Sequence, residues 1–213
     1  MRLAGLYAIT PDAADSHALI ERVRTAMKSS APHGWAALQY RNKLAGAAQR
    51  AAEARELAAL CAEYGVPLIV NDDIELALAA GAGGVHLGSS DGDLVAARAR
   101  VGSRLLGASC YNSLDVARRA VAAGADYVAF GSIYPSPTKP SAARAPLALF
   151  AQARALDVPL VAIGGITLEN AADVIRAGAD CIAVISALFD APDVAARARA
   201  FTDLFSTRTS TAA

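Results

Sequence analysis

Short apolar runs alternate with longer amphipathic segments along the chain. The apolar runs predict eight strands, at residues 3–9, 36–40, 67–70, 84–87, 104–109, 127–131, 159–163 and 181–185. The intervening segments repeat apolar positions with a period near 3.6 and predict helices, among them 46–63, 74–80, 94–100, 114–123, 147–155, 168–177 and 194–205. Strands that are each followed by a helix indicate a parallel sheet with right-handed crossovers.

Three segments share one local pattern, which favours a closed barrel. Residues 79–88, 122–131 and 176–185 each end a helix in Ala, continue with Gly and a tight turn, and enter an apolar strand. Gly81, Gly124 and Gly178 suit this place because glycine adopts positive φ without a steric penalty. We predict a single (β/α)8 barrel over residues 1–206 and a frayed polar tail over 207–213. A doubly wound open sheet is the alternative.

The composition limits the classes of partner. The 213 residues are 54% hydrophobic and carry 20 basic and 20 acidic side chains, so the formal charge is zero. This balance indicates neither a nucleic-acid nor a membrane partner, and an anionic substrate must be held by a local cluster of groups. We expect small phosphorylated substrates and leave open whether the chain forms a homo-oligomer.

The cysteines and the first residues point to a reducing compartment. Cys61, Cys110 and Cys181 are far apart in sequence and form no CxxC pair, so we expect reduced, mostly buried thiols. The sequence MRLAGLYAITPD lacks the features of a signal peptide, and no uncharged apolar run is long enough to cross a bilayer. We therefore expect a cytoplasmic protein.

Unusual polar residues follow the predicted strands, where a barrel of this type carries its chemistry. Gln39, Arg41 and Lys43 come after the second strand, and alternation places them on one side of the chain, facing the barrel mouth. An amide and two cations suit a polar ring with a phosphate chain. A solvated basic turn is the alternative.

Carboxylates follow the third and fourth strands. Asn71, Asp72 and Asp73 end the third strand, and Asp91 follows the fourth. Asp72 and Asp91 are candidates to share one Mg²⁺, which takes few protein ligands and keeps water and phosphate oxygens around it. Helix capping is the alternative for each aspartate, and we expect Asp73 to lie nearer the helix than Asp72. We expect His86 to be a packed or hydrogen-bonded core residue.

The loops after the later strands contain candidate anion donors. The Ser109 hydroxyl is expected in the mouth, although Ser also commonly opens helices. Residues 131–140 hold three prolines in six residues, which stiffen the loop, and Ser136, Thr138 and Lys139 alternate with them. This pattern favours an anion site over a plain surface turn.

Glycine and small residues follow the last two strands. The loops that contain Gly165 and the pair Ile185 and Ser186 correspond to the usual phosphate site of such barrels, which is built from backbone N–H groups. The mouth therefore offers one cationic site near a metal and one neutral site. A diphosphate with Mg²⁺ suits the first and a monophosphate suits the second, so the chemistry best supported is metal-assisted departure of a diphosphate.

From about residue 6 to residue 188 the chain resembles the thiamine phosphate synthase family. The motifs are LQYRNK, LIVNDD, GVHLGSSD, GASCYN, GADYVAFGSIYPSPTKP, VAIGGIT and IAVIS. The resemblance implies a transferase that joins an aminopyrimidine diphosphate to a hydroxyethylthiazole phosphate and releases pyrophosphate. It also implies that the diphosphate leaves first and that the thiazole nitrogen captures the resulting pyrimidine cation, so charge stabilisation and positioning supply the catalysis.

The resemblance also implies roles for individual residues. The aminopyrimidine diphosphate is expected on Gln39, Tyr40, Arg41, Asn42, Lys43, Asn71, Ser109 and Lys139, with Arg41, Lys43, Ser109 and Lys139 as the catalytic set. Mg²⁺ is expected on Asp72 and Asp91. The thiazole phosphate is expected on Ser136, Pro137, Thr138, Gly165, Ile185 and Ser186.

Some positions depart from the family pattern, and two other functions compete. Asn42, Ser89, Tyr111 and Ser136 replace the residues that are common in the family, each with another polar residue. A thiazole tautomerase of the same fold is expected to lose Asp91 or the PTK loop and to gain a histidine near Ser109. A non-catalytic barrel that binds a phosphorylated ligand is expected to lose aspartates or lysines from its mouth.

Overall fold

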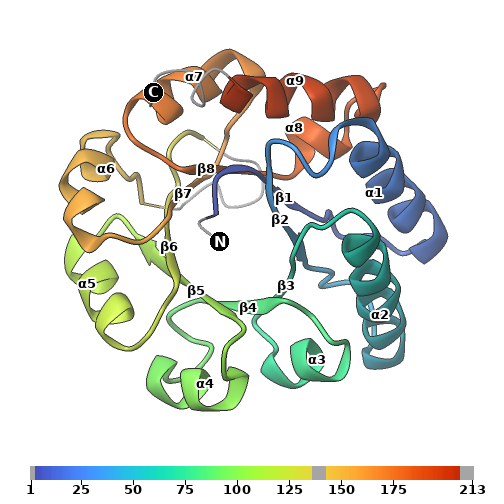
Figure 1. Cartoon of the computed structure of the whole chain (residues 1–213), viewed down its shortest axis with the longest axis horizontal. Coiled ribbons are helices and arrows are strands. Elements are labelled where there is room, and N and C mark those ends of the chain that lie inside the picture. Colours follow the sequence, from blue (N-terminus) through green and yellow to red (C-terminus); the bar gives the residue numbers. More distant parts are fainter. Residues whose placement is uncertain (1–2, 136–142, 207–213) are drawn as a thin grey trace.

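Eight parallel strands close into a barrel in the computed structural model, which describes residues 3–135 and 143–206 (Figure 1). The strands pair in chain order, and β1 pairs with both β2 and β8, which excludes the open sheet. Their bounds are β1 (Gly5–Ile9), β2 (Trp35–Tyr40), β3 (Leu68–Asn71), β4 (Gly84–Leu87), β5 (Leu105–Tyr111), β6 (Tyr127–Phe130), β7 (Leu160–Ile163) and β8 (Cys181–Val184). The predicted (β/α)8 barrel is confirmed.

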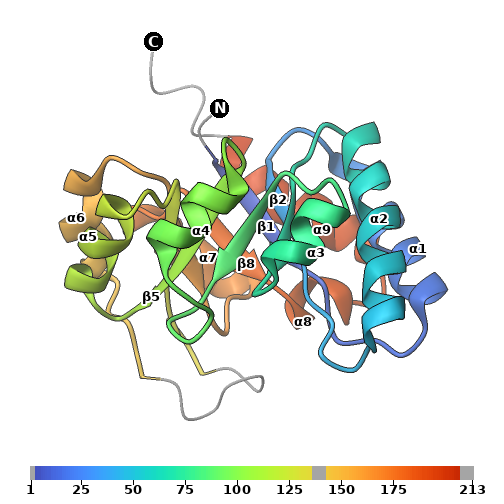
Figure 2. The same ribbon diagram turned by 90° about the horizontal axis from the view of Figure 1, so that it is seen from below.

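Helices form an outer ring around the strands, as the views along and across the barrel show (Figures 1 and 2). They are α1 (Ser16–Ser30), α2 (Ala47–Glu63), α3 (Ile74–Ala79), α4 (Leu94–Val101), α5 (Leu114–Ala122), α6 (Ala148–Ala153), α7 (Leu168–Arg176), α8 (Ser186–Phe189) and α9 (Val194–Ser206), with a 3-10 turn η1 (Arg154–Leu156) after α6. The predicted helix bounds hold to within two residues, apart from the 3-10 turn that ends the sixth helix.

Helix α1 was not among the predicted helices, although its signals are present in the sequence. Asp15 caps its first turn by accepting a hydrogen bond from the backbone N–H of Ala18. Its buried side chains Leu19, Ile20, Val23, Ala26 and Met27 recur with helical spacing. This apolar face packs against the neighbouring strands, and the helix also packs against α9.

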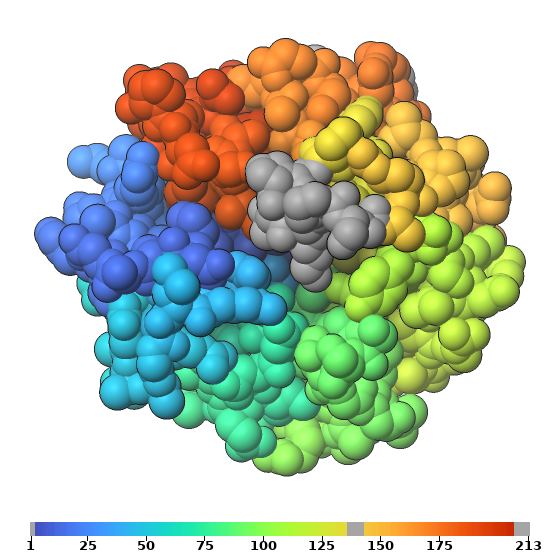
Figure 3. Space-filling view, turned by 180° about the vertical axis from the view of Figure 1, so that it is seen from behind, coloured from blue at the N-terminus to red at the C-terminus, as the bar shows by residue number. Residues whose placement is uncertain are grey.

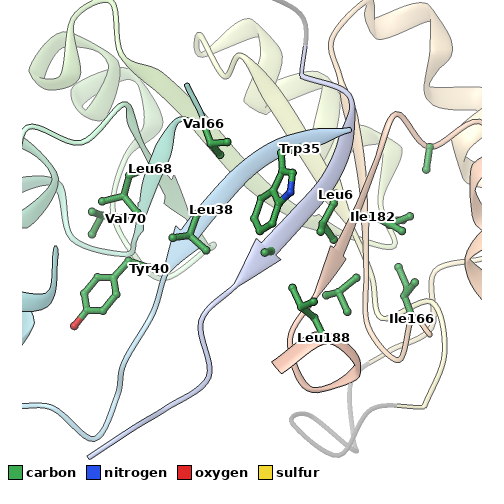
Figure 4. Packing of buried hydrophobic residues seen from close by; sticks show 14 of the residues in the cluster. Leu6, Trp35, Leu38, Tyr40, Val66, Leu68, Val70, Ile166, Ile182 and Leu188 are labelled. Carbon is green, nitrogen blue, oxygen red and sulfur yellow. The ribbon is translucent and has the colours of Figure 1, made fainter. Parts of the chain in front are cut away.

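Alternation along the strands divides the core into two layers. Outward-facing residues such as Leu6, Leu38 and Ile182 pack under the helices (Figure 4). Inward-facing residues fill the barrel itself, and they are Leu3, Tyr7, Ile9, Ala36, Ala37, Ile69, Tyr127, Ala129, Val161, Cys181 and Ala183. The barrel is therefore a packed core, and it opens into a cavity at one end.

The turns between helices and strands lie at the end of the barrel opposite to that cavity. Gly81, Gly124 and Gly178 adopt φ of 67°, 97° and 113°, as the repeated pattern predicts. Cys61, Cys110 and Cys181 are all buried and form no disulfide, as expected. Across residues 3–135 and 143–206, no helix combines the length and apolar character needed to cross a membrane.

Candidate active site

A cavity of about 510 Å³ occupies the end of the barrel where the strands finish. Figure 3 looks onto this end of the barrel. The cavity is lined by predicted site residues from five strand ends, namely Gln39, Arg41, Asn71, Ser109, Gly165, Ile185 and Ser186. Its volume suits a small-molecule substrate.

A second, more polar cavity of about 340 Å³ adjoins the first beside β2 and β3. Lys43, Arg50 and Asp72 line it, and Arg41 and Asn71 line both cavities. The cations and the carboxylate thus gather on one side of the mouth, next to a cavity whose lining after β7 and β8 contains glycines and uncharged residues.

Asp12 orients the basic segment after β2, and sequence reasoning did not identify it. The Nη1 of Arg41 lies 2.9 Å from both carboxylate oxygens of Asp12, and the backbone N–H of Lys43 donates to the same carboxylate at 2.6 Å. Burial alone would raise the pKa of Asp12, but the Lys43 N–H and the Arg41 guanidinium outweigh it and lower the pKa. A charged Asp12 therefore fixes Arg41 at the mouth.

Asp72 and Asp91 come together through a hydrogen bond between their carboxyl groups. Burial and the neighbouring Asp91 raise the pKa of Asp72. Although burial opposes it, hydrogen bonds from the Gly88 N–H and from Asp72 lower the pKa of Asp91. A proton on the pair therefore resides on Asp72, and the arrangement is that of two carboxylates that need a cation or a proton between them.

The helices next to these aspartates are capped by other residues. Asp73 caps α3 by accepting from the Leu76 N–H, and Asp93 caps α4 by accepting from the Ala96 N–H. Asp72 has a φ of 64°, a left-handed conformation that is uncommon outside glycine and that recurs at functional sites. Neither Asp72 nor Asp91 is thus needed as a cap, which leaves both carboxylates for the mouth.

Tyr40 and Asn42 are placed differently from the other predicted substrate-binding residues. Both border the smaller cavity, but the Tyr40 hydroxyl donates to Glu53 at 2.6 Å and the Asn42 amide donates to Glu53 at 3.0 Å. Glu53 also accepts from Ser16 and is a buried residue of α2. The polar heads of Tyr40 and Asn42 therefore hold the loop after β2 against the helices.

Ser109 is tied to a buried polar chain beneath the cavity. Its hydroxyl lies 2.9 Å from His86 Nε2, and His86 Nδ1 lies 3.1 Å from the Tyr127 hydroxyl. Burial lowers the pKa of His86 to about 4, so the ring is neutral near pH 7. The expectation of a hydrogen-bonded core histidine is confirmed, and His86 also reaches the cavity wall.

In the wall formed after β7 and β8, which we call the main-chain wall, Gly164 and Gly165 present backbone atoms to the cavity because glycine has no side chain. Gly165 has a φ of 62°, and a Cβ at this position would lie 2.2 Å from the carbonyl oxygen of Pro135. Asn170 caps the start of α7 by accepting from the Thr167 N–H and donating to the Gly165 carbonyl. The predicted residues Ser136, Pro137, Thr138 and Lys139 lie outside the described residues, as does the tail over 207–213.

Tyr111 links the loops after β4 and β5. Its φ is 54°, its side chain is 42% exposed, and its hydroxyl lies 3.0 Å from the Ser89 hydroxyl and accepts from the Ser89 N–H. Two of the positions that depart from the family pattern therefore contact each other beside Asp91. Tyr111 also lines the larger cavity.

This arrangement defines a (β/α)8-barrel enzyme with a polar mouth divided between charged side chains and main chain. A family model described as "Thiamine monophosphate synthase" matches residues 6–188. The chain belongs to the thiamine monophosphate synthase family.

Known proteins resemble the chain over nearly its whole length. The "Thiamine-phosphate synthase" of Aromatoleum aromaticum is 58% identical over 206 residues, which cover 96% of this chain and 97% of that protein. The "Thiamine-phosphate synthase" of Thiobacillus denitrificans is 57% identical over 203 residues, which cover 94% of each. The solved structure of a thiamine phosphate pyrophosphorylase from Pyrococcus furiosus has a TM-score of 0.82 at 33% identity and covers 95% of this chain and 96% of that one.

Proposed function

We propose that the chain joins an aminopyrimidine diphosphate to a hydroxyethylthiazole phosphate, forming thiamine phosphate and releasing pyrophosphate. The observation that carries this function is the division of one mouth, in a member of this family, into a charged cavity and a main-chain wall. We place the reaction in the cytoplasm, because three buried cysteines that form no disulfide suit a reducing compartment.

The charged cavity is proposed to bind the diphosphate. Arg41 and Lys43 supply positive charge, and the Asn71 side chain borders the junction between the two cavities. The Asp12 carboxylate holds the Arg41 guanidinium in place, so little side-chain freedom is lost when the ligand binds. Lys139, outside the described residues, is proposed to complete this set of cations.

Asp72 and Asp91 are proposed to hold Mg²⁺ beside the diphosphate. Two hydrogen-bonded carboxyls fit a small hard cation, because Mg²⁺ is commonly bound through one or two carboxylates together with water and phosphate oxygens. In the part of the chain that the structure describes, no group of three or more His, Cys, Asp and Glu side chains offers another metal site. When bound, Mg²⁺ would neutralise charge on the leaving diphosphate.

The main-chain wall is proposed to bind the thiazole phosphate. Gly165, Ile185 and Ser186 line the cavity at the ends of β7 and β8, where backbone N–H groups of such barrels commonly bind phosphate. Ser136, Pro137 and Thr138, outside the described residues, are proposed to cover this ligand from the loop after β6. The phosphate thus anchors the thiazole substrate in the larger cavity.

The reaction needs charge stabilisation and positioning more than proton transfer. The bond between the pyrimidine methylene carbon and the diphosphate oxygen breaks, and its electron pair leaves with pyrophosphate. The lone pair of the thiazole nitrogen then forms the new C–N bond, so no proton moves in either step. Arg41, Lys43 and Lys139 stabilise the departing charge, while Gln39 and Ser109 orient the pyrimidine.

The proposed function is tested by a coupling assay with purified protein, both phosphorylated substrates and Mg²⁺, with and without EDTA. We expect thiamine phosphate and pyrophosphate to appear in equal amounts, and only when metal is present. Folded, metal-loaded protein that forms no product would contradict the proposal. Conversion of the thiazole substrate alone would then indicate a tautomerase, and ligand binding without conversion would indicate a binding barrel.

Asp12→Asn is expected to raise the KM for the pyrimidine diphosphate about threefold to tenfold and to leave the KM for the thiazole phosphate unchanged. The amide oxygen still accepts from the Lys43 N–H, but the charge that holds Arg41 is lost, and such partly exposed pairs contribute about 1 kcal/mol. Asp15→Asn is the matched control, because Asn still caps α1. Equal KM values in the two variants would rule out this role for Asp12.

A further inference from the structure

Four polar side chains form a continuous chain from the barrel core to the cavity. The hydroxyls of Tyr7 and Tyr127 lie 2.7 Å apart, the Tyr127 hydroxyl lies 3.1 Å from His86 Nδ1, and His86 Nε2 lies 2.9 Å from the Ser109 hydroxyl. Tyr7, Tyr127 and His86 are all buried, and His86 and Ser109 reach the cavity wall. The four residues stand on β1, β6, β4 and β5, so the barrel itself fixes their spacing.

A glycine on β5 leaves space inside the barrel for this chain of hydrogen-bonded side chains. A Cβ on Gly107, two residues before Ser109 on β5, would lie 2.0 Å from Tyr127 Cζ. The Tyr127 ring therefore occupies space that a side chain at position 107 would need, so this position requires glycine. Its centroid lies 5.8 Å from the Tyr7 ring and 5.6 Å from the His86 ring, so both neighbours confine it. Buried polar chains of this kind rigidify a core when every member is satisfied.

Counting donors and acceptors fixes the direction of the hydrogen bonds among these four side chains. If Tyr7 donates to Tyr127, Tyr127 donates to His86 Nδ1 and His86 Nε2–H donates to Ser109, then every buried hydrogen has a partner within the chain. In the reverse direction, or with a doubly protonated ring, the Tyr7 hydrogen needs an acceptor outside the chain. Cys181 lies near Tyr7, but a thiol sulfur is a weak acceptor.

We propose that Tyr127 holds His86 in the Nε2–H tautomer and that His86 thereby turns the Ser109 hydroxyl hydrogen into the cavity. This inference rests on the proposed function, in which Ser109 contacts the aminopyrimidine. A hydroxyl that has accepted from His86 donates its own hydrogen to an acceptor on the ligand, and the ring nitrogens of an aminopyrimidine are such acceptors. His86 and Tyr127 are positioning residues, since they act through Ser109.

The tautomer is measured directly by NMR of protein labelled with ¹⁵N-histidine. The chain contains three histidines, and the signal that disappears in His86→Asn identifies His86. We expect an unprotonated Nδ1 and a protonated Nε2 in the wild-type protein at pH 7, and a change in this pattern in Tyr127→Phe. A protonated Nδ1 in the wild-type protein would overturn the proposal.

A double-mutant cycle tests whether Tyr127 and His86 act through Ser109. Tyr127→Phe is expected to lower kcat/KM for the pyrimidine diphosphate about tenfold in the wild-type background and less than about twofold in the Ser109→Ala background. Tyr64→Phe is the matched control, because Tyr64 caps the far end of α2 and lies outside both cavities. Thermal unfolding of each variant establishes that it is folded.

The outcomes separate this inference from the proposed function. Additive effects of Tyr127→Phe and Ser109→Ala, with wild-type activity intact, would overturn the positioning role and leave the reaction standing. A wild-type protein that forms no thiamine phosphate would remove the proposed reaction, whereas the NMR signal would still report the direction of the hydrogen bonds. A non-additive cycle together with an Nε2–H tautomer supports the proposal.

Discussion

Asp72→Asn is expected to lower turnover by at least ~10²-fold while the barrel stays folded. The substitution removes one of the two carboxylates proposed to hold Mg²⁺ beside the leaving diphosphate, and lost charge stabilisation of this kind costs two or more powers of ten in rate. Asparagine is preferable to alanine here because Asp72 has a φ of 64°, a conformation that Asn adopts more readily than Ala. Steady-state turnover at saturating Mg²⁺ and substrates measures the effect.

Asp73→Asn provides the control for this prediction. It changes the adjacent carboxyl to the same amide, and Asn still caps α3 through its side-chain oxygen. We expect turnover within about twofold of the wild type, since caps of equal quality differ by a few tenths of a kcal/mol. Unchanged turnover in Asp72→Asn, or an equal loss in both variants, would contradict the metal assignment.

The fold could be predicted from the sequence because the apolar pattern of each strand matches the burial of its two faces in the barrel. The inward-facing positions of β8 hold Cys181 and Ala183, and the outward-facing positions hold Ile182 and Val184, as a strand buried on both faces requires. The ends of elements were harder to predict. The sixth helix gives way to a 3-10 turn at Arg154, where the apolar periodicity continues but the hydrogen-bond pattern changes.

Strand alternation distinguishes the residues near β2 that face the cavity from those that face the helices, which the motif resemblance does not. Gln39 and Arg41 alternate with Tyr40 and Asn42, so the first pair faces the barrel axis and the second pair faces Glu53. A motif read as a continuous string assigns all four residues to the ligand. The period of two separates side chains that contact the cavity from those that anchor its rim.

Asp12 and the partners of His86 were beyond sequence reasoning for a different reason. Asp12 contacts Arg41 across 29 positions of the chain, and His86 contacts Tyr127 across 41. Neither pair has a local spacing that marks it: the pairing of β1 with β2 brings Asp12 to Arg41, and the curvature of the barrel brings β4 and β6 close enough for His86 to meet Tyr127. Asp91 illustrates the same limit. Its sequence position fits either a helix cap or a metal ligand, and the structure shows that Asp93 caps α4 instead.

The charged and main-chain walls are proposed to bind different substrates, so they should be separable by mutation. Changes at Asp12 or Asp72 act on the pyrimidine diphosphate side, while the wall after β7 contains no charged side chain among the described residues that line the larger cavity. A substitution that alters only the path of the main chain at Gly165 therefore tests the second wall without changing any charge.

Gly165→Ala is expected to raise the KM for the thiazole phosphate at least ~10-fold and to change the KM for the pyrimidine diphosphate little. The new Cβ would lie 2.2 Å from the Pro135 carbonyl oxygen and 2.8 Å from Tyr134 Cβ, so the loop must move from its place in the cavity wall. A displacement of about 1 Å in such a loop is enough for losses of this size. Initial rates with each substrate varied in turn measure both KM values.

Gly81→Ala separates this displacement from backbone strain. Gly81 has a φ of 67°, close to the 62° of Gly165, but a Cβ there meets no atom within 4 Å. Both variants therefore carry the similar cost of a left-handed alanine, about 1 kcal/mol, and only Gly165→Ala moves the cavity wall. We expect Gly81→Ala to lose a little stability and to keep both KM values. If Gly165→Ala behaved in the same way, the main-chain wall would not be the phosphate site, and the thiazole phosphate would have to be held by the loop after β6 alone.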